Sequence, residues 1–191
     1  GLCAAVAAGL GMAAPEATEE VADAAPSPAV SQLGGTWPVA GRVVGIVADA
    51  DSDVDAVQAA REALDEAGIV PLVIAPAGGT LGGPDGGIPV QRTYLTARST
   101  EFDAVLVAGS GAPGPDAQPG RDAKAGQPGS AVDPRLVLLL TELFRHAKAI
   151  GGWDAAAGCL DAAGIPQDAA GLALGDSPAD VVPKLTGLLA A

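Results

Sequence analysis

The sequence predicts an α/β fold, a doubly wound and mostly parallel sheet of five strands with helices on both faces. Two observations predict it. Short apolar runs rich in Val, Ile and Leu alternate with longer segments whose apolar residues recur at helical spacing. The stretches between runs leave room for the crossover connections that parallel strands require. The five expected strands cover residues 43–47, 70–74, 104–107, 149–152 and 171–174.

The first crossover carries helix signals at both of its ends. Ser52 or Asp53 can cap a helix that follows the first strand, because both side chains accept backbone N–H bonds. Gly68 would end this helix as a C′ residue. The inward face of the helix would carry four apolar residues, Val54, Val57, Ala60 and Leu64.

A glycine-rich stretch interrupts the alternation after the second strand. Residues 78–87 contain six glycines and a Pro-Asp-Gly-Gly turn, which predicts a hairpin-like excursion with 88–90 as its returning arm. The buried run 104–107 then gives the third strand, followed by a Gly/Pro-rich loop that extends to Asp133.

The second half of the chain repeats the strand and helix signals. Asp133 is expected to cap a helix with Pro134 at its first position. A short helix over 155–163 follows the fourth strand and ends at Gly164. The last helix opens with an N-cap, a first-turn proline and an acid at N3, which are Ser177, Pro178 and Asp180. The core stripe of the helix after Asp133 comprises Leu136, Leu139, Leu140 and Leu143.

These crossovers favour a flavodoxin-like strand order, 2-1-3-4-5. The folded domain is expected to span 41–191. Residues 15–40 are rich in Pro, Glu, Ala, Ser and Gly without sustained periodicity, which predicts a linker. Residues 1–14 are interpreted as the end of a helix that belongs to a preceding region.

Composition excludes several classes of function. Ten basic against 23 acidic residues give a formal net charge of −13, which repels nucleic acids and anionic membrane surfaces. No run approaches the 18 apolar residues that indicate a membrane-spanning helix. Cys3 and Cys159 form no metal-binding or disulfide pattern, so a reducing, cytoplasmic compartment is expected.

The turn after the fourth strand stands where folds of this pattern present a catalytic nucleophile. It reads Gly151, Gly152, Trp153, Asp154, with no Cys, Ser or His. Trp153 is interpreted as a plug of the former pocket, and a modified ligand pocket is the alternative. No catalytic residue is therefore assigned to this chain.

A second candidate site follows the third strand. Gly109–Gly114 spells GxGxxG, as in dinucleotide-binding loops. Pro113, Pro115 and the long loop that follows prevent the last glycine from opening a helix that could hold a pyrophosphate. No cofactor is assigned here, although the cleft near Trp153 and Gly109 is left open as a metabolite site because open α/β sheets bind ligands at this edge.

Three further groups have a structural interpretation as well as a chemical one. Asp49, Asp51 and Asp53 could bind a metal, but acids at a helix start also favour the helix dipole, so no metal site is assigned. His146, the only histidine, has no triad partner in sequence. Cys159 is expected to be a small buried apolar residue beyond the first turn of its helix.

Three segments resemble a known family. They are GRVVGIVADADSD, GGIPVQRTYLTARSTEFDAVLVAGS and DPRLVLLLTELFRHAKAIGGWDAAAGCLDAAGI. They resemble the C-terminal domain of large-subunit haem catalases, which is similar to the PfpI-like, class I glutamine amidotransferase-like fold. The resemblance covers about 41–189, and residues 1–14 would then end the catalase region.

The resemblance implies a parent enzyme that converts hydrogen peroxide to water and oxygen with haem, as a cytoplasmic homotetramer. It implies that this domain is non-catalytic and supports stability, assembly and access to the haem, with the parent's own catalase core and tetramer neighbours as partners. Tyr94 and His146 match no catalase motif, so the parent's haem residues do not carry over. Two alternatives remain: a standalone PfpI-like hydrolase, glyoxalase-type enzyme or chaperone, and a flavodoxin-like module that binds a small ligand.

Overall fold

A computed structural model describes residues 2–14, 16, 35–83, 87–111, 132–153 and 156–191. The chain divides into two compact units, residues 1–34 and 35–191. The first unit contains helix α1, Leu2–Gly9. The second unit holds the whole sheet and its helices, and it contains every candidate site discussed below.

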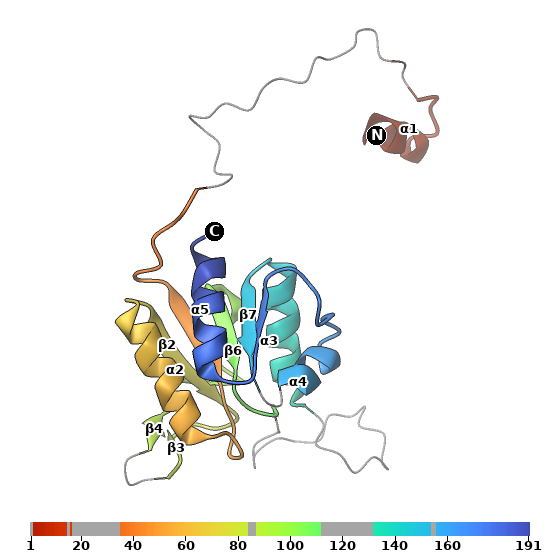
Figure 1. Cartoon of the computed structure of the whole chain (residues 1–191). Coiled ribbons are helices and arrows are strands. Elements are labelled where there is room, and N and C mark those ends of the chain that lie inside the picture. Colours follow the sequence, from red (N-terminus) through yellow and green to blue (C-terminus); the bar gives the residue numbers. More distant parts are fainter. Residues whose placement is uncertain (1, 15, 17–34, 84–86, 112–131, 154–155) are drawn as a thin grey trace, which may run out of the picture. The chain divides into compact units, whose positions relative to one another are not determined.

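The main sheet has six strands in the order β5-β2-β1-β6-β7-β8, and each neighbouring pair is parallel (Figure 1). The expected count of five strands is therefore wrong by one. Without β5, the remaining order is the predicted 2-1-3-4-5. The strands are β1 Val43–Val47, β2 Val70–Ala75, β5 Arg92–Thr93, β6 Ala104–Val107, β7 Ala149–Gly152 and β8 Leu172–Leu174.

The missed strand β5 lies at the edge of the sheet beside β2. It has two half-buried polar residues, so it lacks the apolar run by which the other strands are recognised. Gln91, just before it, accepts the Val73 backbone N–H with Oε1 at 2.7 Å. The side chain thus satisfies an edge donor that a longer β5 would otherwise pair.

The expected excursion after β2 is a small antiparallel pair. β3, Thr80–Leu81, pairs with β4, Ile88–Pro89, in a separate two-stranded sheet. The turn residues 84–86 lie outside the described residues. Leu81 and Ile88 are buried in the apolar cluster that also contains Val57 and Leu64, so the β3–β4 pair is anchored to the domain.

Helices cover both faces of the sheet, as the sequence predicts. α2, Val54–Glu66, and α5, Pro178–Leu189, lie on one face, and α3, Pro134–Arg145, and α4, Ala156–Ala162, on the other (Figure 1). A short 3-10 helix, η1 Ser99–Glu101, precedes β6. Among the described residues, no helix is long and apolar enough to cross a membrane.

The predicted caps explain where these helices begin. Asp53, not Ser52, caps α2 by accepting the backbone N–H groups of Asp55 and Ala56. Asp133 accepts the Arg135 N–H at the start of α3, and Ser177 accepts the Asp180 N–H at the start of α5. Such caps each stabilise a helix by about 1 kcal/mol.

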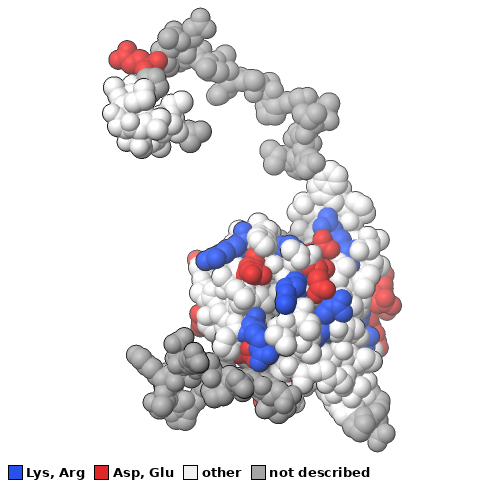
Figure 2. Space-filling model, turned by 180° about the vertical axis from the view of Figure 1, so that it is seen from behind, with Lys and Arg blue, Asp and Glu red and all other residues white. Residues whose placement is uncertain are grey.

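One side of the larger unit carries charged side chains of both signs. Figure 2 shows several Lys and Arg side chains, interspersed with acidic ones, on the side turned away from the viewer in Figure 1. In a chain with 10 basic and 23 acidic residues, such a gathering of cations differs from what the net charge alone would suggest.

Candidate functional site

Residues from three strand ends meet at the carboxyl edge of the sheet. Asp49 follows β1, Gly109–Gly111 follow β6, and Trp153 follows β7. β1 and β6 are neighbours whose crossovers leave in opposite directions, which is the switch point where open α/β sheets bind ligands. Gly109 and Trp153, around which the sequence analysis leaves a metabolite site open, therefore lie at this edge.

The carboxylate of Asp49 ties the β1 end to the β6 loop. It is 2% exposed, and its Oδ2 accepts the Ser110 hydroxyl at 3.0 Å and the Gly111 backbone N–H at 2.9 Å. Its Oδ1 accepts the Ser52 hydroxyl and the Asp51 N–H, each at 3.1 Å. In the described part of this loop, the Ser110 hydroxyl and the Gly111 N–H, two donors that a bound anion could use, are thus satisfied by Asp49.

Gly109 shows how closely this loop approaches Asp49. A Cβ atom at position 109 would lie 2.6 Å from the Ser52 Oγ and 2.8 Å from the Asp49 Cγ. The glycine is therefore required for contact between two parts of the protein, and not for the approach of a pyrophosphate. Residues 112–114, the second half of the GxGxxG pattern, lie outside the described residues.

Trp153 is buried at the position expected for the nucleophile. It is 2% exposed and belongs to the apolar cluster shared by the sheet and the α2/α5 layer. Its indole Nε1–H is buried without an acceptor among the described residues. Burial is what a plug requires, and Asp154 lies outside the described residues.

Cys159 also faces this edge, from α4. It is the fourth residue of that helix, nearer its start than the sequence suggests, and its Sγ lies 3.6 Å from the Gly109 carbonyl oxygen. Burial, and then the nearby Asp49 carboxylate, raise the pKa of this thiol to about 11. At neutral pH the group is therefore a protonated, buried thiol and not a nucleophile.

Thiol labelling should distinguish the two cysteines. We expect Cys159 in the native chain to react with iodoacetamide at least about 100-fold more slowly than exposed Cys3 at pH 7.5, because its pKa is about two units above the ordinary value. Mass spectrometry of each cysteine over time measures this. In urea the two rates should converge, and equal native rates would contradict the buried position of Cys159.

Two further buried polar groups lie near the edge: Tyr94, which sequence reasoning did not place there, and Asp133, which it identified only as a helix cap. The Tyr94 hydroxyl donates to the Ala48 carbonyl at 3.2 Å. Burial, followed by the charges of Asp49, Cys159 and Asp133, raises the Tyr94 pKa well above its usual value. The Asp133 Oδ1 accepts from Arg135, while its Oδ2 is buried without a partner among the described residues.

The remaining candidates do not join this edge. His146 is exposed at the C-terminal end of α3, the end opposite Asp133. Asp51 and Asp53 are exposed, and Asp53 serves as the helix cap. Within the described part of the chain, no three His, Cys, Asp or Glu side chains are placed to hold a metal ion.

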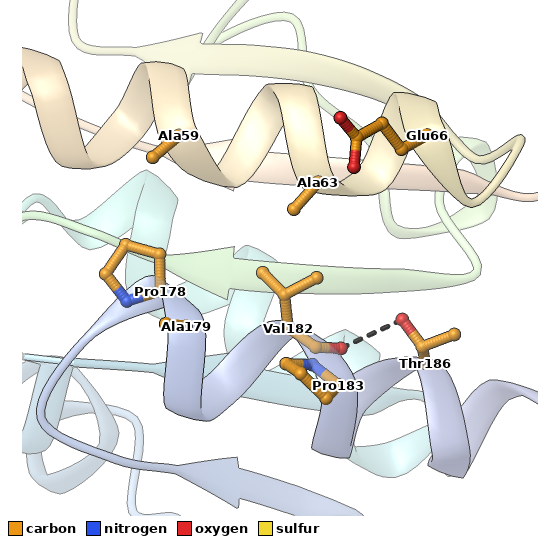
Figure 3. Close-up of a pocket in the computed structure, with 8 residues that line it drawn as sticks. All are labelled: Ala59, Ala63, Glu66, Pro178, Ala179, Val182, Pro183 and Thr186. Atoms are coloured by element: carbon orange, nitrogen blue, oxygen red, sulfur yellow. Dashed lines mark hydrogen bonds between the residues drawn. The ribbon is translucent and has the colours of Figure 1, made fainter.

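A surface groove of about 480 Å³ runs between α2 and α5 (Figure 3). Small and apolar side chains line it, including Ala59, Ala63 and Pro183, with Glu66 at its margin. The Thr186 hydroxyl on its wall already donates to the Val182 carbonyl at 2.8 Å. The groove therefore offers no acid and base pair and no cation.

A second hollow, of about 340 Å³, lies between the segment after β5 and the exposed side of α3. It has two guanidinium groups on its wall, from Arg98 and Arg135, together with apolar side chains. It is distinct from the carboxyl edge, since neither Asp49 nor Trp153 lines it.

Comparison with known proteins gives a consistent result. Residues 40–191 match the model of a family described as the C-terminal domain found in long catalases. The chain is also 37% identical over 168 residues to catalase HPII of Mycobacterium avium, an alignment that covers 86% of this chain and 22% of that relative. The chain thus spans about a fifth of the length of the curated relative it matches.

Proposed function

Because the chain belongs to the family of C-terminal domains found in long catalases, we propose that it is a non-catalytic accessory domain of a large-subunit haem catalase. The parent reaction converts hydrogen peroxide to water and oxygen. The domain contributes stability and assembly, and it borders the route to the haem. Its partners are the parent's own catalase core and the neighbouring subunits of a cytoplasmic homotetramer.

In the described part of the carboxyl edge, buried Trp153 and the hydrogen bonds of Asp49 are the observations that best support a role without chemistry. A hydrolase of the PfpI-like kind needs an activated nucleophile at the elbow, where this chain has buried Trp153. The nearby thiol of Cys159 has a pKa of about 11, and the histidine is exposed at the far end of α3. A ligand-binding module needs free donors at the β6 loop, and in the described part of that loop Asp49 accepts from Ser110 and Gly111.

The residues of this chain do not fit a haem. A catalase iron is held by a tyrosine oxygen, and Tyr94 is the chain's only tyrosine. Its hydroxyl is buried, donates to a backbone carbonyl, and has a pKa raised well above the usual value. The haem therefore belongs to the core of the parent enzyme.

Peroxide consumption and the haem absorbance band test the proposal. The chain alone should show neither, whereas the full-length parent should show both. A parent that ends at the position of residue 34, and so lacks the folded domain 35–191, should keep most of its activity per haem. It should lose thermal stability or tetramer content. A shortened parent with unchanged stability and assembly would contradict the accessory role, and a full-length parent without haem would remove the catalase assignment.

A further inference from the structure

The hollow beside α3 combines two cations with an apolar wall. Arg98 comes from the segment after β5, and Arg135 from the first turn of α3. Leu138 on α3 and Leu95 on the facing segment also line it. The volume of about 340 Å³ falls at the lower end of the range for small-molecule sites, about 300 to 1,000 Å³.

Both guanidinium groups retain unused donors. Arg98 Nη1 donates to the Leu95 and Ala97 carbonyls, and no carboxylate lies within ion-pair distance of the Arg98 side chain among the described residues. Arg135 binds Asp133 through Nε, and its two Nη groups make no hydrogen bond within the described part of the chain. A guanidinium with free parallel donors binds a planar carboxylate in a bidentate manner.

Glu142 also lines the hollow, yet it forms no ion pair with either arginine. The carboxylate of Asp133 pairs with Arg135, so the two arginines stand against two acids, Asp133 and Glu142, and the hollow has no excess of positive charge. An anionic ligand would therefore be held by directed N–H bonds from the guanidinium groups and not by the net charge of the hollow.

The apolar wall is exposed to an unusual degree. Leu95 is 60% exposed and Leu138 is 59% exposed, and the two flank the same hollow. A bound apolar group would remove these side chains from water. The gain in free energy is about 25 cal/mol for each Å² of apolar surface covered. The ligand therefore needs an apolar body as well as a negative group.

We propose that this hollow, formed by Leu95, Arg98, Arg135 and Leu138, binds a small carboxylate with an apolar chain. The carboxylate of the ligand accepts N–H bonds from the arginine side chains, and the alkyl chain of the ligand covers the two leucines. This site lies apart from the carboxyl edge of the sheet, so ligand binding there does not require Asp49 or Trp153 to move. It adds a binding function to the accessory role and does not depend on that role.

An NMR titration of the full 191-residue chain with hexanoate tests the proposal. Hexanoate should shift the backbone amides of 94–98 and 135–142 in a saturable manner. Two control ligands should each bind at least about tenfold more weakly than hexanoate. Hexan-1-ol has the same alkyl chain without the charge, and acetate has the charge without the long alkyl chain. Added salt should weaken hexanoate binding, because Arg98 is exposed and Arg135 is half-buried, so both charges are screened by ions.

Substitutions assign the binding to particular side chains. Arg98→Gln and Arg135→Gln should each weaken hexanoate binding about tenfold, since a charge-assisted hydrogen bond is lost. Leu138→Gln should weaken it while leaving both arginines in place. Arg145→Gln, at the exposed end of the same helix, is the matched control and should change affinity less than about twofold.

Three results would overturn the proposal. The first is no saturable shift with hexanoate. The second is equal binding of hexanoate and hexan-1-ol that the arginine substitutions leave unchanged. The third is a set of shifts confined to the groove between α2 and α5, which would indicate unselective apolar contact. The spectrum of each variant also shows whether it is folded, so a loss of binding through unfolding is recognised.

Discussion

Replacement of Trp153 by alanine is expected to lower the free energy of unfolding by about 3 to 5 kcal/mol, the range for a large-to-small change at a buried aromatic residue. Trp153 is 2% exposed and shares its cluster with Val181 and Ala108. Few aromatic residues are available to refill the space, because aromatics make up 3% of the chain. Urea unfolding followed by circular dichroism measures the loss.

Two variants separate the packing of Trp153 from other effects. Trp153→Phe keeps a ring and removes the indole N–H that lacks an acceptor, so its cost should stay below about 1.5 kcal/mol. Trp37→Ala removes the chain's other tryptophan, which is 42% exposed, and should cost no more than about 0.5 kcal/mol. A near-neutral Trp153→Ala would contradict the plug and indicate a side chain kept for binding.

The sequence predicts most of the fold because its signals are local. Apolar runs mark five strands, and caps such as Asp133 and Ser177 mark helix starts, so each element can be recognised by itself. β5 escapes because two polar residues at a sheet edge leave no periodic signal. Its pairing with β2 is a tertiary interaction that no local pattern contains.

The candidate site is less predictable for the same reason. The sequence places Asp49 and Gly109 at the same edge of the sheet, but their contact depends on the register of β1 and β6. The choice between Ser52 and Asp53 as helix cap depends instead on the turn after β1, where the Ser52 hydroxyl donates to Asp49, three residues earlier. The hollow with Arg98 and Arg135 joins segments 37 positions apart, which no motif connects.

Asp49→Ala is expected to destabilise the domain by about 3 kcal/mol. The substitution removes a buried carboxylate that accepts from Ser110, Gly111, Ser52 and Asp51, and it leaves the buried Gly111 N–H without its partner. Each buried group left unsatisfied costs about 1 to 3 kcal/mol, although such costs do not add fully. The free energy of unfolding in urea checks the value.

Two neighbouring substitutions serve as comparisons for Asp49→Ala. Asp51→Ala removes an exposed acid from the same turn and should change stability by no more than about 0.5 kcal/mol. Ser110→Ala should cost about 1 kcal/mol, and combining it with Asp49→Ala should give less than the sum, because both remove the same 3.0 Å bond.

If Asp49→Ala were instead neutral or stabilising, the carboxylate would be a group retained at a cost to stability, as functional residues are. The carboxyl edge would then be a working site, and the proposal of a domain without chemistry would fail.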